Sequence, residues 1–192
     1  MVIVGVFGIL INVTTLVWLL AEVAMQRRQY LMGGKAVRTE WRSLGAVIGT
    51  VLLGDVLAVV ARSAVPGADF GGSAVLTVAL VVMWAGIAFR LWAIHTLGRF
   101  FRGVVHIQAD HQVVTAGPYR VLRHPSYAGA MVAVLGLALA FENTVSLVAL
   151  FGCALAGVLY RIRVEEQVLS SALGDAYTAY AAGTRRLVPG VW

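Results

Sequence analysis

The chain has 192 residues, of which 60% are hydrophobic and 12% are charged, with a net charge of +6, and its mean hydropathy is +0.85. Soluble domains average about 45–50% apolar and about 25% charged residues, so this composition excludes an ordinary soluble globule and a disordered chain. The single cysteine, Cys153, excludes a disulfide scaffold and a multi-cysteine metal site. We therefore interpret the chain as an integral membrane protein and expect no nucleic-acid partner.

Three long apolar segments occupy the first half of the sequence. Residues 1–21 and 70–89 carry no charged side chain, and residues 43–61 are interrupted only by Asp55. About 20 apolar residues cover the roughly 30 Å hydrocarbon core of a bilayer, where helices or closed barrels alone satisfy the backbone. We therefore predict three transmembrane helices within residues 1–97.

Asp55 is the one charged residue within the second of these segments. A carboxylate inside a bilayer is energetically expensive and is a functional candidate by default. It could accept a hydrogen bond from Thr50 or Ser63, or it could pair with Arg90. These alternatives leave the role of Asp55 open.

Polar residues 95–125 come next and contain all four histidines of the chain. Their end runs into the sequence Gly-Pro-Tyr-Arg-Val-Leu-Arg-His-Pro-Ser-Tyr-Ala-Gly, from Gly117 to Gly129. Gly-Pro is turn chemistry, and Pro125 suits the first turn of a helix while biasing His124 toward an extended backbone. We predict that this segment holds a histidine and two tyrosines at the membrane surface, beside a helix end that attracts anionic groups.

Two further apolar segments, residues 126–141 and 143–160, are separated only by Glu142. The first of the pair is short for a membrane span, and the single residue between them predicts a tight helical hairpin. The predicted fold class is therefore all-α: an integral membrane protein with about five transmembrane helices, the last two forming a hairpin, plus a cytoplasmic loop and C-terminal helices.

The tail begins with Arg-Ile-Arg-Val-Glu-Glu-Gln directly after the last apolar segment. On a helix, Arg161 and Glu165 share one face, whereas Arg163 and Glu166 share another. Gly174 predicts a break, so we expect one or two short helices on the membrane surface. We interpret the chain as one membrane domain, 1–192, with three apolar spans in 1–97, a cytoplasmic loop in 98–125, a helical hairpin in 126–160 and a cytoplasmic tail in 161–192.

The basic residues predict the orientation of the chain. Thirteen of the fifteen Lys and Arg residues lie in the loop after the first span, in the loop after the third span or in the tail. All three segments fall on one side of a five-span chain, and the positive-inside rule assigns that side to the cytoplasm. We therefore predict a protein of the cell inner membrane, surrounded by membrane lipids, with its N-terminus outside. No basic segment precedes the first apolar run, so a cleaved signal peptide is not expected.

Two motifs follow one another in the second half of the chain. Gly-x-Tyr-x-x-x-Arg-His-Pro-x-Tyr-x-Gly at 117–129 precedes the hairpin, and Arg-x-x-x-Glu-Glu at 161–166 follows it. Further along the tail come Leu169, Gly174-x-x-Tyr177-x-x-Tyr180 and Pro189. Together these residues resemble the isoprenylcysteine carboxyl methyltransferase family of membrane enzymes, over roughly residues 98–192. The first three spans match that family in number and hydrophobicity only.

The resemblance implies an enzyme that takes a methyl group from S-adenosylmethionine and passes it to a lipophilic or lipid-linked acceptor reached from the bilayer. The first acceptor implied is a carboxylate such as that of a prenylated cysteine. The resemblance makes Arg161 and Glu165 the catalytic pair, with Glu165 binding the cofactor and Arg161 facing the acceptor. The further cofactor contacts that it implies are His106, His111, Gln112, Val113, Val114, Tyr119, His124, Pro125, Ser126 and Tyr127.

Elementary chemistry suits these implied roles. Methyl transfer from a sulfonium is an in-line displacement, so its catalysis consists mostly of positioning and desolvation. A carboxylate acceptor is already ionised and needs a cation, which Arg161 offers as a permanent charge with a planar donor fork. An amine or thiol acceptor would have to lose a proton, and Glu165, Glu166 or His124 would then be candidate bases. The acceptor and the use of a base stay open.

Other interpretations fit parts of the sequence. Membrane sterol and steroid reductases have a similar Arg-His-Pro-x-Tyr element and bind NADPH, and a non-catalytic membrane scaffold would use the polar tail to dock a partner. His106, His111 and Asp110 could be metal ligands, but no fourth ligand lies at a fitting spacing, so we predict no metal site. Small residues in the spans permit close helix packing and leave the oligomeric state unspecified.

Overall fold

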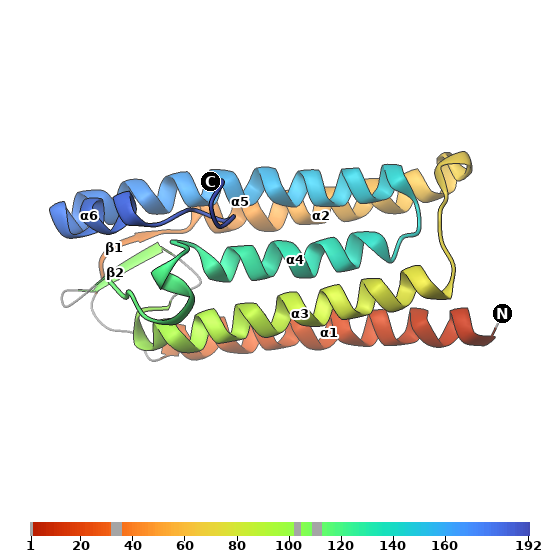
Figure 1. Cartoon of the computed structure of the whole chain (residues 1–192), viewed down its shortest axis with the longest axis horizontal. Helices are drawn as coiled ribbons and strands as arrows, with labels where there is room; N and C mark the ends of the chain where they lie inside the picture. The colour runs from red at the N-terminus through yellow and green to blue at the C-terminus, as the bar shows by residue number, and fades with distance from the viewer. Residues whose placement is uncertain (1, 32–35, 102–104, 109–112) are drawn as a thin grey trace.

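Five helices, each running opposite to the one before it in the chain, form a bundle, and a short helix and the C-terminal segment fold against one of its ends (Figure 1). The computed structural model describes residues 2–31, 36–101, 105–108 and 113–192. Its helices and strands are α1 (Val2–Leu31), β1 (Ala36–Glu40), α2 (Arg42–Ala64), α3 (Ser73–Leu97), β2 (Val105–Gln108), α4 (Pro125–Leu139), α5 (Thr144–Leu173) and α6 (Asp175–Gly183). Three short 3-10 turns connect them, η1 (Pro66–Ala68), η2 (Gly98–Phe100) and η3 (Gly117–Arg120).

Four of the helices, α1, α2, α3 and α5, are long and apolar enough to cross a membrane. The fourth apolar segment forms α4, which has 15 residues and therefore covers only about 22 Å. Large aliphatic side chains are exposed along α1 and α2, as expected of helices that contact lipid. The predicted all-α membrane class and its short fourth span are confirmed.

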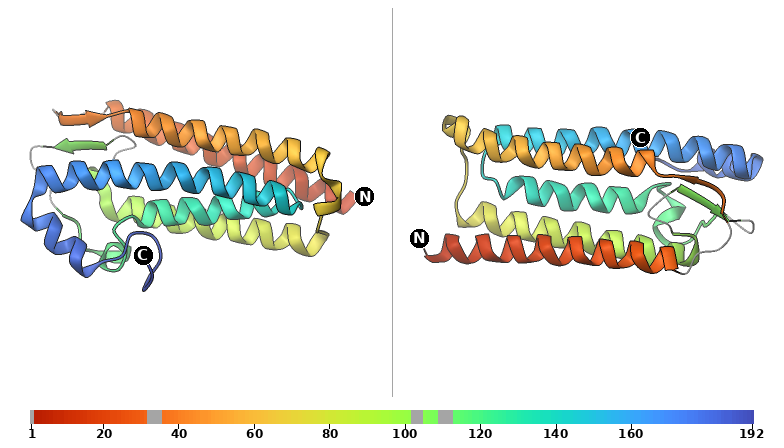
Figure 2. Two further views of the ribbon diagram at one scale, coloured as in Figure 1. Left: turned by 90° about the horizontal axis from the view of Figure 1, so that it is seen from above. Right: turned by 180° about the vertical axis from the view of Figure 1, so that it is seen from behind.

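The helices pack side by side in the order α1, α3, α4, α5 and α2 (Figure 2). Helices α3 and α4 approach so closely that glycine is required between them. A Cβ atom on Gly129 would lie 2.6 Å from the backbone nitrogen of Arg90, and a Cβ on Gly136 would overlap the backbone of Met83. This close contact fixes the start of α4 relative to α3.

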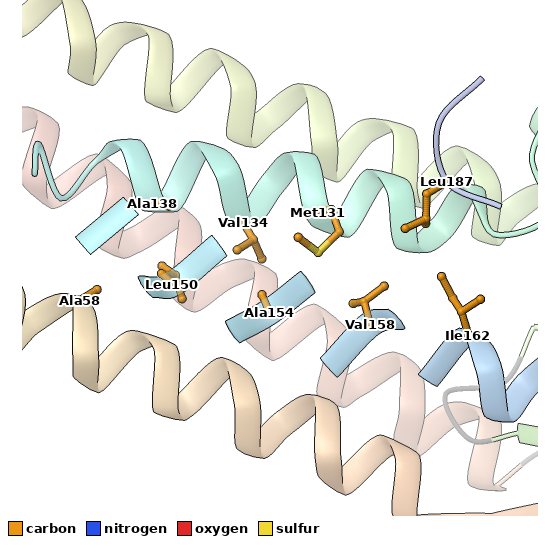
Figure 3. Close-up of a cluster of buried hydrophobic side chains, with 9 residues drawn as sticks. All are labelled: Ala58, Met131, Val134, Ala138, Leu150, Ala154, Val158, Ile162 and Leu187. Atoms are coloured by element: carbon orange, nitrogen blue, oxygen red, sulfur yellow. The ribbon is translucent and has the colours of Figure 1, made fainter. Parts of the chain in front are cut away.

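The largest apolar cluster lies between α4 and α5 (Figure 3). Leu150, Ala154, Val158 and Ile162 follow one face of α5 at helical spacing and are almost completely buried. Leu187 of the C-terminal segment completes this cluster. The end of the chain therefore belongs to the folded core.

The hairpin turn between α4 and α5 is held by side-chain hydrogen bonds. Asn143 is fully buried and caps α5, because its Oδ1 accepts the N–H of Ser146 at 3.0 Å. Its Nδ2 donates to the carbonyl of Val65 at 2.9 Å and to Oδ1 of Asp69 at 2.6 Å. These bonds attach the predicted tight hairpin to the α2–α3 connection.

The opposite end of the bundle carries the polar segments. The connections that follow α1 and α3 both lie there, together with α6 and the C-terminus (Figure 1). The two connections pair as the antiparallel strands β1 and β2, with Thr39 opposite His106 and Glu40 opposite Val105. This strand pair is an addition to the predicted helices.

Helix α5 extends well beyond the predicted span that ended at residue 160. It runs without interruption to Leu173, so the Arg-x-x-x-Glu-Glu motif lies in the same helix as the apolar segment before it. Gly174 then ends the helix with a φ of 54°, and α6 follows. The predicted break at Gly174 is confirmed, whereas the first part of the predicted tail is a continuation of α5.

None of the partners considered for Asp55 bonds to it. Thr50 donates to the carbonyl of Val47, and Ser63 donates to the backbone of its own helix turn. Arg90 pairs with Glu22 of α1 instead. Asp55 is exposed on α2 and forms no hydrogen bond or ion pair within the described part of the chain.

Candidate functional site

The turn that leads into α4 is built from glycine and proline. Gly117 adopts a φ of 52°, and Pro118 follows at the start of η3. Pro125 is the first residue of α4, and His124 before it has φ −124° and ψ 54°, outside the helical region. The predicted Gly-Pro turn and the predicted helix start at Pro125 are both confirmed. Together they hold His124, which is 4% exposed, at the N-terminal end of α4.

The C-terminal segment secures this turn through main-chain hydrogen bonds. The N–H of Arg123 donates to the carbonyl of Arg185 at 2.7 Å, and the N–H of His124 donates to the carbonyl of Arg186 at 3.1 Å. In return, the N–H of Arg185 donates to the carbonyl of Val121 at 2.9 Å. The backbone of the Arg-His-Pro motif is therefore positioned by the far end of the chain.

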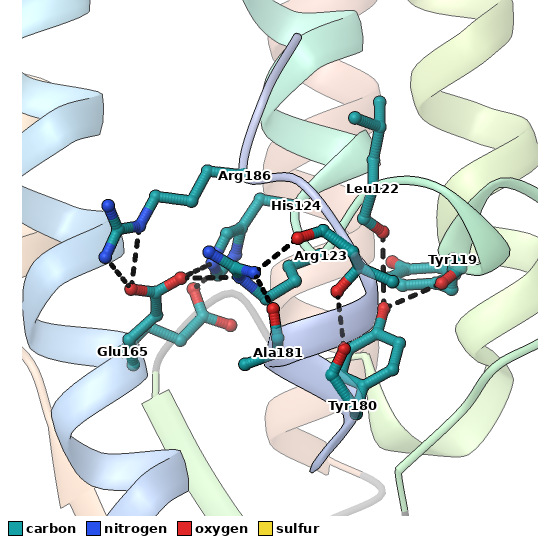
Figure 4. Close-up of polar contacts among 10 residues, drawn as sticks. Tyr119, Leu122, Arg123, His124, Glu165, Tyr180, Ala181 and Arg186 are labelled. Atoms are coloured by element: carbon teal, nitrogen blue, oxygen red, sulfur yellow. Dashed lines mark hydrogen bonds and ion pairs between the residues drawn. The ribbon is translucent and has the colours of Figure 1, made fainter. Parts of the chain in front are cut away.

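Glu166 joins α5 to both of these segments. Its Oε1 accepts from Nε of Arg123 at 2.9 Å and lies 3.3 Å from Nε2 of His124. Its Oε2 accepts from Nε of Arg186 at 2.9 Å. Figure 4 shows Arg123, His124 and Arg186 pointing toward the carboxylates of this part of α5. The Glu166 side chain is 15% exposed, so these contacts form a partly buried charge network.

A second polar network runs from α2 through α4 to α5. Arg161 is 2% exposed and donates from Nη1 to Oγ of Ser43 at 2.6 Å. Its Nε donates to the hydroxyl of Tyr127 at 3.0 Å, and that hydroxyl donates to Oε2 of Glu165 at 2.8 Å. Arg161 and Glu165, which were predicted to share a helix face, are therefore linked through Tyr127.

His124 lies between the two networks. Its ring stacks on that of Tyr127, with 5.7 Å between the ring centroids and 27° between the planes. Its Nδ1 is 3.9 Å from Oε2 of Glu165, while its Nε2 faces Glu166. The imidazole is therefore held between the two adjacent carboxylates.

Three tyrosines surround the same region from η3 and α6. The hydroxyl of Tyr180 donates to the carbonyl of Tyr119 at 2.8 Å, and burial raises the pKa of Tyr180 to about 12. Burial, together with the negative charge of Glu165, also raises the pKa of Tyr119. The hydroxyl of Tyr177 is buried and has no hydrogen-bond partner among the described residues. All three phenols are therefore neutral hydrogen-bond donors near pH 7.

The first turn of α4 is also fixed from within the bundle. Arg90 of α3 donates from Nη1 to the carbonyl of Ser126 at 3.0 Å and forms a two-fold contact with the carboxylate of Glu22. The indole of Trp18 donates to the same carboxylate at 3.1 Å. Helix α1 thus contributes to the position of the site through Arg90.

The structure brings together many of the residues that the sequence singles out. Tyr119, His124, Pro125, Ser126, Tyr127, Arg161 and Glu165 lie at the junction of η3, α4 and α5. Val113 and Val114 are half-buried on the segment that enters η3.

The backbone of His106 lies in β2, opposite Thr39. His111 and Gln112, and Asp110 of the considered metal set, lie outside the described residues. Within the described residues, no group of three metal-ligating side chains occurs.

Sequence reasoning missed several residues of the two networks. Arg123 is part of the quoted motif, but its ion pair with Glu166 joins residues 43 positions apart. Ser43 lies at the start of an apolar segment in the sequence, yet it is fully buried against Arg161. In the sequence, Arg186 is simply one of the basic residues of the tail. Local spacing contains no signal for any of these three contacts.

The arrangement can hold a cation and an anion close together. Glu165 is 27% exposed at its side chain and can accept further hydrogen bonds, whereas Arg161 places a permanent positive charge nearby. The Tyr127 hydroxyl touches both groups. A site of this kind can bind a cationic ligand through its carboxylate and an anionic ligand through its guanidinium.

Comparison with known families gives a match to about half of the chain. The model of the isoprenylcysteine carboxyl methyltransferase (ICMT) family matches residues 77–171. This match begins within α3, upstream of the residues that carried the resemblance, and includes both motifs.

Curated relatives are similar over the same part of the chain. Protein-S-isoprenylcysteine O-methyltransferase A of Arabidopsis thaliana is 35% identical over 112 residues, which cover 57% of each protein. The protein-S-isoprenylcysteine O-methyltransferase of Schizosaccharomyces pombe is 36% identical over 116 residues, covering 59% of this chain and 47% of the yeast protein. The uncharacterized protein YpbQ of Bacillus subtilis is 30% identical over 96 residues, covering 45% of this chain and 56% of YpbQ. The chain thus spans about half the length of the curated relatives it matches.

A solved structure has a similar fold. The eukaryotic intramembrane Ras methyltransferase ICMT superimposes with a TM-score of 0.56 and 25% sequence identity, covering 74% of this chain and 51% of that protein. The likeness extends beyond the region of the family match and includes most of the helical bundle.

Proposed function

The chain belongs to the isoprenylcysteine carboxyl methyltransferase family, and we propose that it transfers a methyl group from S-adenosylmethionine to a lipophilic acceptor in the membrane. The acceptor of this proposal is a carboxylate, such as that of a prenylated cysteine or an analogous lipid. The observation that carries the proposal is the linked set Arg161–Tyr127–Glu165 at the polar end of the bundle.

The donor set of the site fits the cofactor. The carboxylate of Glu165 suits the ammonium and hydroxyl groups of S-adenosylmethionine and lowers the energy of a nearby positive sulfur. The neighbouring contacts of this proposal come from Tyr119, His124, Pro125, Ser126 and Tyr127, of which His124 and Tyr127 stack on each other. When bound, the cofactor supplies an electrophilic methyl group that leaves sulfur as the acceptor oxygen bonds to it. The resemblance adds His106, His111, Gln112, Val113 and Val114 to this set.

Arg161 is the proposed binding group for the acceptor. An ionised carboxylate needs no general base, but it must be desolvated and held in line with the methyl group. The guanidinium is buried and keeps its charge, and its bonds to Ser43 and Tyr127 fix the direction of its donor fork. Arg161 thereby offsets the cost of removing the acceptor carboxylate from water.

The hydrocarbon part of the acceptor is proposed to reach the site from the bilayer. The site lies at the end of a bundle whose long helices expose aliphatic side chains. We place this end at the cytoplasmic face of the cell inner membrane, with the N-terminus outside. This orientation is supported by the basic residues in the segments at this end, because the positive-inside rule assigns such segments to the cytoplasm.

Two measurements test the proposed function: binding of the cofactor product and methyl transfer to an acceptor. We expect saturable binding of S-adenosylhomocysteine to the purified protein in lipid nanodiscs, and methyl transfer to a farnesylated cysteine carboxylate. Arg161→Lys should retain the binding but lose about 10²-fold in turnover, because an ammonium cannot reproduce the bidentate fork. Glu165→Gln should weaken the binding itself.

A matched control lies two residues from Arg161. Arg163 is exposed on α5, so Arg163→Lys should leave both binding and turnover unchanged. Absence of binding by folded wild-type protein, or preferential binding of NADPH, would contradict the proposed function.

A further inference from the structure

The hydroxyl of Tyr177 is an unexplained polar group beside the proposed site. Tyr177 belongs to α6 and is 4% exposed. Its Oη is the buried side-chain polar atom that lacks any hydrogen-bond partner within the described part of the protein. A buried hydroxyl without a partner is destabilising, so such a group in a folded protein calls for a ligand or another reason.

The surroundings of this hydroxyl are charged. The negative charges of Glu166 and Glu165 raise the pKa of Tyr177 together with its burial, while the positive charge of Arg123 opposes them. The phenol therefore stays protonated, and it bonds to neither carboxylate. A small polar group placed between the phenol and a carboxylate would satisfy both.

Only one of the two carboxylates is available for such a group. Glu166 receives hydrogen bonds from Arg123 and Arg186 on its two oxygens and also faces His124. Glu165 accepts the Tyr127 hydroxyl on Oε2, and among the described residues no hydrogen bond reaches its Oε1. Among the described residues, Glu165 and Tyr177 therefore both have unused hydrogen-bonding capacity.

We propose that Tyr177 is a ligand-binding residue, whose hydroxyl donates a hydrogen bond to a ribose hydroxyl of the methyl donor while that ribose hydroxyl donates to Glu165. The chemistry of a hydroxyl suits both groups, because it accepts from the phenol and donates to the carboxylate at the same time. An ammonium has only donors and would leave the phenol proton without an acceptor. This inference rests on the proposed function, because it concerns the same cofactor.

Tyr180 provides a matched control on the same helix. Its hydroxyl is three residues further along α6 and donates to the backbone carbonyl of Tyr119 at 2.8 Å. Removal of this hydroxyl therefore breaks a bond within the protein, whereas removal of the Tyr177 hydroxyl breaks none among the described residues.

The first experiment compares Tyr177→Phe and Tyr180→Phe without ligand and with S-adenosylhomocysteine. We expect the melting temperature of ligand-free Tyr177→Phe to equal or exceed that of wild type, and that of Tyr180→Phe to fall. We expect Tyr177→Phe to bind S-adenosylhomocysteine about tenfold more weakly, the loss typical of one hydrogen bond. Unchanged affinity, or a fall in ligand-free melting temperature as large as that of Tyr180→Phe, would overturn the inference.

The second experiment identifies the ligand group. The 2′-deoxy and 3′-deoxy analogues of S-adenosylhomocysteine are titrated against wild type and Tyr177→Phe. For one analogue, the variant and the missing hydroxyl together should cost no more affinity than the missing hydroxyl alone, because the bond lost in Tyr177→Phe is one of the two that the missing hydroxyl already removes. Additive losses with both analogues would overturn the assignment to ribose. Failure of wild type to bind S-adenosylhomocysteine would instead overturn the proposed function itself.

Discussion

Glu165 and Glu166 are adjacent in sequence but differ in their hydrogen bonding. Glu166 bonds to Arg123 and Arg186 and so holds together α5, the turn before α4 and the C-terminal segment. Glu165 accepts a hydrogen bond from the hydroxyl of Tyr127 and lies 3.9 Å from Nδ1 of His124. One residue of displacement turns the side chain about 100° around the helix, which explains the difference. We therefore propose a structural role for Glu166 and a ligand-binding role for Glu165.

This division predicts that two equivalent substitutions differ in their effect on stability. Glu166→Gln should lower the unfolding free energy by about 1–3 kcal/mol, since it weakens a partly buried network that two arginines share. Glu165→Gln should change the unfolding free energy by less than about 0.5 kcal/mol, because it affects one hydrogen bond at a partly exposed carboxylate.

Thermal unfolding in nanodiscs and titration with S-adenosylhomocysteine separate the two roles. The Glu165 variant should melt near the wild-type temperature and lose affinity. Equal destabilisation by both substitutions would contradict the division.

At the scale of elements, the contact between α3 and α4 depends on glycine. Gly86 and Gly129 face each other across this contact, and a Cβ on either one would overlap the backbone of the other helix. Main-chain atoms cannot move aside as a flexible side chain can, so these positions tolerate no larger residue. The close contact brings Arg90 to the first turn of α4, where it bonds to the carbonyl of Ser126.

Gly136→Ala should therefore destabilise the protein by about 1–3 kcal/mol, because its new methyl group forces α3 and α4 apart. Gly152→Ala on α5 is the matched control, since nothing lies within 4 Å of the Cβ it would introduce. That substitution should be neutral or stabilising, because alanine is a better helix former than glycine. Differential scanning fluorimetry of both variants checks the prediction, which fails if the two melt alike.

At the scale of the whole molecule, α1 joins the bundle through its packing on α3. The pair of Glu22 and Arg90 lies at this contact, and both side chains are largely buried. Arg90 also bonds to Ser126 in the first turn of α4, so the same guanidinium connects α1, α3 and the candidate site. The pair thus couples the part of the chain outside the family match to the part that contains the motifs.

Glu22→Gln should destabilise the protein by about 3–5 kcal/mol, because it leaves the buried charge of Arg90 without its counter-ion. The double variant Glu22→Met/Arg90→Met should recover most of this stability, since it removes both charges together. It should still bind S-adenosylhomocysteine more weakly, because the carbonyl of Ser126 loses its donor. Melting temperatures of wild type, Glu22→Gln and the double variant, together with their affinities for S-adenosylhomocysteine, check this prediction. A double variant no more stable than Glu22→Gln would show that the ion pair is not the cause.

The features that the sequence determined by itself are local ones. Long apolar runs produce membrane-spanning helices because the backbone must satisfy its own hydrogen bonds in lipid. Pro125 and Gly174 mark the start of α4 and the end of α5, because one lacks an N–H and the other accepts a positive φ. The two motifs are local as well, because their spacing can be read along the sequence. They indicated the family, and they singled out Arg161 and Glu165 as candidate site residues.

Only the tertiary structure decided which polar groups meet. The partners of Arg161, Glu166 and Arg90 come from other helices or from the C-terminal segment. Hydropathy and spacing describe one helix at a time, whereas these contacts depend on the packing order of five helices. The same packing buries the Tyr177 hydroxyl without a hydrogen-bond partner among the described residues, a property that no local pattern could reveal. Where lipid and close packing exclude water, each polar side chain must find its partner across the fold, and the fold alone determines that choice.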